Sequence, residues 1–325
     1  ATNLLTAVAD ARLDSIPLVA ITGQAPLSMI GTDAFQEVDT YGMSVPVTKH
    51  NVLVRSAQEL LAVIPEAFRI AASGRPGPVW IDVPKDVQKE LVTFDEWPEP
   101  GRADPAPQAD SRSLDEAARL IRNAGRPVIY AGGGIVHSGA SEVLLELAER
   151  THTPVTMTLN ALGAMPYDHP LSLGMLGMHG SRWTNAVLDR ADLLVVLGAR
   201  FDDRATGRLA DFCPHAHVVH VDIDAAELGK LRTAHVPIRA DARSVIEGLL
   251  ERLDTIDRTG WLGDIAALRR EMPPAPAGSD DASTPCGLLQ SIAAGLDDDA
   301  IVVTDVGQHR CGPRRAGPCG GRAAG

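Results

Sequence analysis

RPVIYAGGG, spanning Arg126 to Gly134, is a short apolar run that ends directly in three consecutive glycines. A second run, ADLLVVLGAR from Ala191 to Arg200, has the same form, and a helical pattern covers Ala140 to Thr151 between the two. Short apolar runs bounded by turn residues are typical of strands buried on both faces. Because strands that alternate with helices pair in parallel, this part of the chain is predicted to be an α/β domain.

The alternation extends outward from this stretch. Towards the N-terminus, predicted strands at Ile16–Gln24 and Val79–Val83 flank a helix over 56–73, with Ser56 as its N-cap and Glu59 completing a capping box. Within the domain of the opening stretch, further elements follow the same order: helices at 114–123 and 242–253, and strands in PVTMTL (154–159) and HVVHVDID (217–224).

Proline-rich segments divide the chain. Trp97 to Asp110 carries four prolines without periodicity, and PPAPAGS (273–279) is a second such segment. A helix over 284–296 and a strand over 300–307 then begin a third unit. The expected organisation is a domain at 1–97, a linker at 98–113, a domain at 114–272, a linker at 273–283, the start of a third domain at 284–309 and a tail at 310–325.

Composition excludes several classes of function. The net charge of −12 disfavours nucleic acid as a partner, and no apolar run is long enough to span a membrane. The four cysteines, at positions 213, 286, 311 and 319, have no metal-binding spacing, and no zinc-protease or serine-hydrolase motif is present, so no metal ligand is assigned. This cysteine usage fits a reducing cytoplasm.

Three turns carry residues suited to binding a dinucleotide. Gly132 to Gly134 follow one strand, GARFDDR (198–204) follows another, and Asp222 and Asp224 end a third. Ligands of open α/β sheets bind at the carboxyl ends of the strands, so three such turns in one domain favour a dinucleotide site. Each turn alone has an ordinary alternative as a glycine turn or a solvated loop. Lys85 and Phe35 also have ordinary alternatives. Taken alone, Lys85 could be a surface lysine, and Phe35 could be a core residue.

Nine strings resemble one family in order and spacing. They are ATNLLTAVADA, IPLVAITGQ, IGTDAFQEVD, TKHNVLV, AFRIAASGRPGPVWIDVPKDV, LGMLGMHG, LGARFDDRATG, HVDID and VVTDVGQH, and together they resemble the large catalytic subunit of acetolactate (acetohydroxyacid) synthases. GTDAFQE, GMHG and GARFDDR are the specific ones, whereas SGRPGPV followed by VPKD is shared more widely among thiamine-diphosphate enzymes.

The resemblance implies an α/β fold of successive parallel-sheet, three-layer domains: a pyrimidine-binding domain, an FAD-binding domain and the start of a diphosphate-binding domain. It implies the decarboxylating condensation of pyruvate with pyruvate or 2-ketobutyrate in branched-chain amino-acid biosynthesis, with thiamine diphosphate, Mg²⁺ and FAD. Mg²⁺ ligands are expected outside this chain. The residues that resemble active-site residues are Phe35 and Gln36 near the cofactor, Lys85 at the substrate channel, Met178 beside the reaction centre and Arg204, which selects the second ketoacid.

Cofactor contacts are also implied by the resemblance. FAD would contact Arg75, Gly132, Gly133, Thr158, Leu159, Leu176, His179, Gly198, Arg200, Asp202, Asp222, Ile223 and Asp241. The thiamine-diphosphate site would begin at Val306, Gly307, Gln308 and His309. Members assemble as homodimers or tetramers with a small regulatory subunit, so the same partners are expected here.

The chain departs from the family pattern within its length and at its ends. Asn160 replaces a usual Gln and Ala205 a usual Val. The family's activating glutamate would precede Ala1, and QMWAAQ would follow His309. A one-base deletion in codons for QMWAAQ can give RCGPR, so 310–325 is interpreted as a frameshift product. The alternatives are an inactive fragment that at most binds FAD, and another FAD-containing carboligase such as glyoxylate carboligase; no turnover is expected from residues 1–325 alone.

Overall fold

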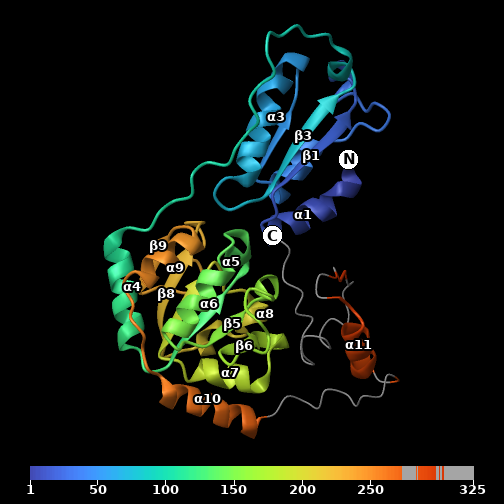
Figure 1. Ribbon diagram of the computed structural model, residues 1–325. Helices are drawn as coiled ribbons and strands as arrows, with labels where there is room; N and C mark the ends of the chain where they lie inside the picture. The colour runs from blue at the N-terminus through green and yellow to red at the C-terminus, as the bar shows by residue number, and fades with distance from the viewer. Residues whose placement is uncertain (273–282, 284, 298–299, 301, 304–325) are drawn as a thin grey trace. The chain divides into compact units, whose positions relative to one another are not determined.

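The computed structural model describes residues 1–272, 283, 285–297, 300, 302 and 303 (Figure 1). The chain forms two compact units, Ala1–Ala106 (unit 1) and Pro107–Gly325 (unit 2). Each unit contains one sheet in which every strand pair is parallel. The predicted α/β class is therefore confirmed.

Unit 1 is a three-stranded sheet of order β1-β3-β2 with a helix on each face. Every residue of the central strand β3 is buried, which explains why its sequence is apolar apart from Asp82. Val79 and Ile81 face helix α3, whereas Trp80 packs with Val8 of helix α1 on the other face. The elements are α1 Leu5–Asp14, β1 Leu18–Gln24, α2 Thr40–Ser44, β2 His50–Leu53, α3 Ala57–Ala72 and β3 Pro78–Pro84, with 3-10 turns at Thr2–Leu4, Leu27–Met29, Val45–Val47 and Val87–Lys89.

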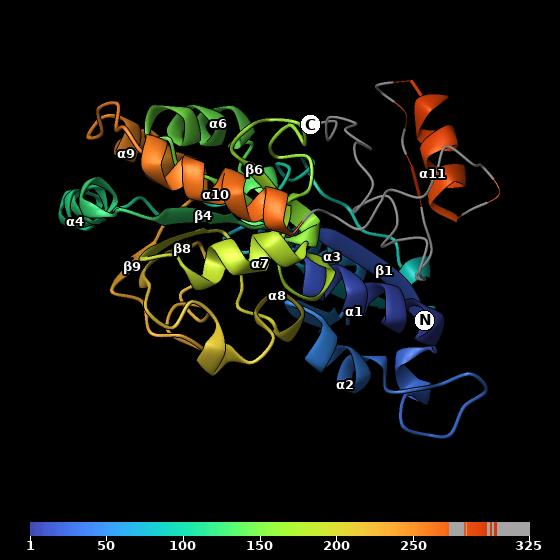
Figure 2. The same ribbon diagram turned by 90° about the horizontal axis from the view of Figure 1, so that it is seen from below.

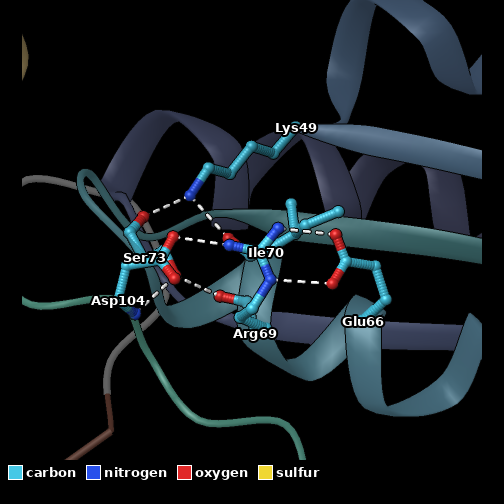
Figure 3. A network of polar contacts seen from close by, with 6 residues as sticks. All are labelled: Lys49, Glu66, Arg69, Ile70, Ser73 and Asp104. Atoms are coloured by element: carbon cyan, nitrogen blue, oxygen red, sulfur yellow. Dashed lines mark hydrogen bonds and ion pairs between the residues drawn. The ribbon is translucent and has the colours of Figure 1, made fainter. Parts of the chain in front are cut away.

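Both ends of α3 are capped by side chains. The N-cap prediction is confirmed, because the Ser56 hydroxyl accepts the Glu59 N–H at 3.4 Å. The Glu59 carboxylate accepts the N–H of Arg55 at 2.8 Å, one residue before the position that a capping box uses. At the other end, the Lys49 ammonium donates to the carbonyls of Ile70, at 2.5 Å, and Ser73 (Figure 3). A cation there complements the helix dipole.

Residues 91–103, called the strap here, cross α3. The residues just before and just after the strap form hydrogen bonds with the two ends of α3. Before the strap, the Glu90 carboxylate accepts the Ala57 N–H at the start of α3 at 2.7 Å. After it, Asp104 accepts from the Arg69 guanidinium at 2.5 Å and donates its N–H to the Ser73 hydroxyl at 2.9 Å (Figure 3).

Between its two ties the strap contacts α3 through apolar side chains. None of the described residues forms a hydrogen bond with residues 91–103. The rings of Phe94 and Trp97 meet edge to face, with centroids 4.6 Å apart. Together with α3 they line an apolar cavity of about 560 Å³. The strap is therefore fixed by its ends and by packing, not by backbone hydrogen bonds.

Unit 2 is built on a six-stranded sheet of order β6-β5-β4-β7-β8-β9. Its strands are β4 Pro127–Ala131, β5 Val155–Met157, β6 Ser172–Met175, β7 Leu193–Leu197, β8 His217–Asp222 and β9 Val236–Arg239. Its helices are α4 Ser111–Asn123, α5 Gly133–His137, α6 Ser141–Arg150, α7 Arg182–Asp189, α8 Asp203–Thr206, α9 Ala242–Leu250, α10 Thr259–Glu271 and α11 Pro285–Ala294, with 3-10 turns at Leu159–Ala161, Gly177–His179 and Leu209–Asp211.

Alternate residues of the central strands pack into two separate cores. Ile129 and Val195 face α4, α5, α6 and α9, whereas Tyr130 and Val196 face α7 and α10. Figure 2 shows α6 and α9 on one side of this sheet and α7 on the other. Unit 2 is therefore a three-layer arrangement in which the sheet is covered on both faces.

Some predicted elements are refined and others lie outside the described residues. Strands β2, β6 and β9 and helices α7 and α10 were not predicted as elements. The predicted helix over 284–296 is found as α11. The predicted strand over 300–307 and the interpreted tail at 310–325 lie outside the described residues, except for positions 300, 302 and 303. Within the described part of the chain, no helix is long and apolar enough to cross a membrane.

Candidate functional site

The strand order of unit 2 reverses direction between β4 and β7. From β4 the chain continues to β5 and β6 on one side, then returns to β7, β8 and β9 on the other. All six strands are parallel, so their carboxyl ends share one edge. The point of reversal at that edge is where ligands of open α/β sheets bind. The predicted dinucleotide residues of unit 2 all lie in the turns along this edge.

At the point of reversal, the turns that follow β4 and β7 are in backbone contact. The Gly132 N–H donates to the Leu197 carbonyl at 2.9 Å, and the Gly134 N–H donates to the Gly198 carbonyl at 3.1 Å. Gly198 has φ +57°, and a Cβ on it would lie 2.6 Å from Gly134 Cα. A Cβ on Gly132 would lie 2.1 Å from the Gly198 oxygen. Glycine is required here because any side chain would separate the two turns.

Buried aromatic side chains support the turn after β7. The Tyr130 hydroxyl donates to the Arg200 carbonyl at 2.8 Å, and its ring meets the Phe201 ring edge to face. Burial raises the pKa of the Tyr130 hydroxyl, so it remains a donor. The Asp202 carboxylate accepts the N–H groups of Arg204 and Ala205, each at 3.0 Å, and so caps α8.

His220 supports the same turn from β8. Its Nε2 lies 3.1 Å from the Ala199 carbonyl, which only accepts, so Nε2 donates in this contact. Burial lowers the pKa of His220, which favours the neutral ring. The ring also packs edge to face on Phe201, with centroids 5.2 Å apart. These contacts link β8 to the turn that carries Arg200.

The structure brings Met178 and Arg204 together. Arg204 Nη1 lies 3.6 Å from Met178 Sδ, and both side chains are largely exposed. Their two turns touch at Gly177, where a Cβ would lie 2.2 Å from the Arg204 carbonyl oxygen. Asn185 of α7 holds this turn by accepting the Gly177 N–H at 2.9 Å and donating to its carbonyl at 3.0 Å. A cation and a thioether are thus presented side by side at the strand edge.

Other predicted cofactor residues lie along the same edge and differ in burial and in hydrogen bonding. Thr158 Oγ1, after β5, is buried and has no hydrogen-bond partner among the described residues. Asp222 is buried at the end of β8, where its carboxylate accepts the Asp224 N–H at 2.8 Å. The Asp241 carboxylate caps α9 by accepting the Ser244 N–H at 3.2 Å. Leu176 is buried, Leu159 is exposed, and Gly133, His179 and Ile223 are partly exposed.

In unit 1, three predicted catalytic residues belong to the carboxyl ends of β1 and β3. Phe35, 89% exposed, and Gln36, with φ +60°, lie in the loop between β1 and α2. Lys85 is exposed directly after β3, and its N–H donates to the Gln24 carbonyl at 3.0 Å. Arg75 instead precedes β3, where its Nε donates to the Ser15 hydroxyl at 2.8 Å.

The predicted thiamine-diphosphate residues Val306 to His309 lie outside the described residues. Among the residues that are described, no group of three or more His, Cys, Asp or Glu side chains is arranged to hold a metal ion.

Several supporting residues were missed in the sequence. Tyr130 lies inside the predicted strand RPVIYAGGG, and His220 begins the quoted string HVDID, yet neither was given a role. Polar side chains inside apolar strands were the available signal, because a buried polar group requires a partner. Asn185 gave no such signal, since a polar residue in a helix is usually solvated.

Comparisons with known proteins point to one group of enzymes. Residues 1–43 match the family model of the N-terminal TPP binding domain of thiamine pyrophosphate enzymes, and residues 114–249 match that of their central domain. The acetolactate synthase isozyme 1 large subunit of Escherichia coli is 55% identical over 319 residues, which cover 98% of this chain and 56% of that protein.

Two further relatives are similar over a comparable extent. The acetolactate synthase of Mycobacterium bovis is 48% identical over 321 residues, which cover 95% of this chain and 52% of that protein. The acetolactate synthase isozyme 2 large subunit of Escherichia coli is 44% identical over 311 residues, with 95% and 56% covered. The chain thus spans about half the length of the curated relatives that it matches.

Proposed function

Because the chain belongs to the thiamine pyrophosphate enzyme family, we propose that it is the large subunit of an acetolactate synthase. The proposed reaction condenses pyruvate with a second 2-ketoacid, pyruvate or 2-ketobutyrate, with loss of CO₂. The observation that carries the proposal is the pairing of Met178 with Arg204 at the strand edge, on the two turns whose sequences resemble this family most specifically.

FAD is the proposed ligand of the strand edge in unit 2. Gly132 and Gly198 allow two backbones to meet at the point of reversal, and glycine turns at such a point commonly bind a diphosphate through their N–H groups. The unpartnered Thr158 hydroxyl is available to the ligand, and Asp222 is the last residue of β8, where an acid commonly binds ribose hydroxyls. These residues fit the group. The reaction requires no redox step, so the proposed role of FAD is structural.

Arg204 is proposed to bind the second ketoacid. Its planar guanidinium matches the geometry of a carboxylate and can donate two parallel hydrogen bonds to it. Met178, in contact with Arg204, offers an apolar and polarisable surface for the rest of that substrate. Bound thiamine diphosphate supplies the carbon nucleophile once pyruvate has lost CO₂. In unit 1, Phe35 and Gln36 are proposed to line the active-site entry near the cofactor, and Lys85 is the proposed residue of the substrate channel.

Further parts of the proposal follow from the sequence resemblance and from the names of the relatives. Mg²⁺ would accompany the diphosphate of the thiamine cofactor. A small regulatory subunit is proposed as a partner, since the relatives are named large subunits. Homodimeric or tetrameric assembly and a cytoplasmic location complete the proposal.

Flavin binding tests the unit 2 site directly. We expect the 325-residue chain to bind FAD, seen as quenching of flavin fluorescence. Thr158→Val, which keeps the shape but removes the hydroxyl, should weaken binding roughly fivefold or more, as expected for one lost hydrogen bond. Thr156→Val is the matched control, because the Thr156 hydroxyl already donates to the Gly174 carbonyl. A folded chain without flavin affinity would contradict the assignment.

A chimera tests the reaction. Residues 1–272 replace the matching region of the Escherichia coli isozyme 1 large subunit, and acetolactate formation from pyruvate is measured with all three cofactors. We expect product, and we expect Arg204→Gln to lower kcat/KM roughly 10- to 100-fold because charged hydrogen bonds are lost. A chimera that folds and binds FAD but forms no acetolactate overturns the proposed function.

A further inference from the structure

A buried carboxylate lies beneath the exposed loop of unit 1. Asp82 is 1% exposed in the central strand β3. Its oxygens accept from the Thr22 hydroxyl at 2.5 Å, from the Thr40 hydroxyl and from Gln24 Nε2 at 3.4 Å. Burial raises the pKa of Asp82, and these hydrogen bonds oppose that rise. The donors come from β1 and from the first residue of α2. One carboxylate of β3 therefore connects β3, β1 and α2.

The loop between β1 and α2, residues 25–39, is tied at both ends to this cluster. At its end, Gln24 Nε2 donates to the Val38 carbonyl at 2.9 Å and to the Thr40 hydroxyl at 3.1 Å. At its start, Gln24 Oε1 accepts the Ala25 N–H at 2.8 Å, and Asp86 accepts the Leu27 N–H at 3.0 Å.

Residues inside this loop have little else to hold them. Phe35 is 89% exposed, and Gln36 has a left-handed backbone with φ +60°. The hydrogen bonds within the loop are short-range, such as Glu37 N–H to the Ala34 carbonyl at 2.9 Å. The ends of the loop therefore determine where Phe35 and Gln36 are presented at the carboxyl edge of the sheet.

We propose that Asp82 and Gln24 are positioning residues that hold both ends of the loop 25–39 and so place Phe35 and Gln36. This rests on the proposed function, in which those two residues line the active-site entry near the cofactor. The Asp82 carboxylate is suited to the task because all three of its partners donate, and a carboxylate only accepts. An amide in its place would lose the negative charge and one accepting group, and its N–H could not be accepted by Gln24 Nε2.

Hydrogen exchange of the chain without cofactors or substrate tests the proposal. Thr40→Val keeps the shape of the side chain but removes the hydroxyl, whereas Thr40→Ser keeps the hydroxyl. We expect Thr40→Val, Gln24→Ala and Asp82→Asn each to speed exchange at the Met29 and Glu37 amides roughly tenfold or more. Thr40→Ser should restore slow exchange, and β3 amides should be unaffected.

Ser73→Ala is the matched control, since it removes hydrogen bonds of the same unit at the opposite end of β3. Its loop amides should exchange as in the parent chain. Unchanged loop exchange in Thr40→Val and Gln24→Ala overturns the proposal, and so does equal acceleration in β3, which indicates general destabilisation. If Asp82→Asn unfolds the unit, the comparison of Thr40→Val with Thr40→Ser still tests the proposal. Hydrogen exchange measures no catalysis. A negative result here would therefore overturn the positioning role without bearing on the proposed reaction.

Discussion

Gly198 is the residue at which the two turns of the unit 2 edge come closest. Gly198→Ala would bring a methyl group against Gly134 and would place it on a backbone with φ +57°. Gly229 offers a matched control, because it has φ +77° with no atom within 4 Å of the added Cβ. We expect Gly229→Ala to lower the free energy of unfolding by ~1–2 kcal/mol, the cost of left-handed backbone. Gly198→Ala should lower it further and abolish FAD binding; equal effects in urea denaturation would contradict this.

His220 makes the stability of unit 2 depend on pH. Burial lowers its pKa below the ordinary 6.5. Below pH 6.5 the unfolded chain therefore binds a proton that the folded chain does not, so the free energy of unfolding falls as pH falls, until the folded pKa is reached. The slope approaches ~1.4 kcal/mol per pH unit for one proton. His220→Gln retains a donor for the Ala199 carbonyl but cannot titrate.

We expect the parent chain to lose stability relative to His220→Gln between pH 7.5 and 5.5, measured by urea denaturation at each pH. A difference that stays constant over this range would show that His220 does not titrate differently on folding. His235, whose pKa is also lowered by burial, is present in both chains and cancels in the comparison.

At the scale of elements, one guanidinium contributes much of the tie at the second end of the strap. Arg69 contacts both Asp104 and Glu66, and its hydrogen bonds hold the pKa of each carboxyl below its usual range (Figure 3). Arg69→Gln removes this tie while Lys49 still caps α3. We therefore expect trypsin to cleave after Arg102 several times faster in Arg69→Gln, measured by mass spectrometry. Arg119→Gln, which breaks only the exposed pair with Glu116, should leave that rate unchanged.

Sequence patterns predicted the buried elements and missed the marginal ones. β3, β4 and β7 are buried along their whole length, and apart from Asp82 of β3 no charged residue interrupts them, so the sequence identifies them as strands. β9, an edge strand, alternates buried and exposed residues over four positions and contains a proline. Such a run is too short to separate from a loop by periodicity.

The candidate site was likewise predictable only in part. Local motifs identified the turns after β4, β7 and β8, because glycine and aspartate at strand ends have a direct physical meaning. Asp82 was not identified, since its role depends on Thr22 and Thr40, which are 60 and 42 residues away in sequence. Partners at that separation are set by the fold and not by any local pattern.

At the scale of the whole molecule, each unit has its own hydrophobic core. Two core clusters belong to residues 1–106 and two to residues 107–272. We expect calorimetry to resolve two unfolding transitions. Val79→Ala, a truncation in the core of residues 1–106, should shift only one of them, and Gly198→Ala only the other. A single transition that both variants shift equally would contradict separate units.

The tied ends of the strap suggest a use in protein engineering. Glu90 and Asp104 fix the chain on either side, whereas the backbone between them takes part in no hydrogen bond with the described residues. A guest sequence spliced in after Glu99 would interrupt no ladder and no helix. Lengthening a loop costs only ~0.6 kcal/mol for each doubling. The strap is thus a natural site for a fluorescent reporter or an affinity tag within the chain.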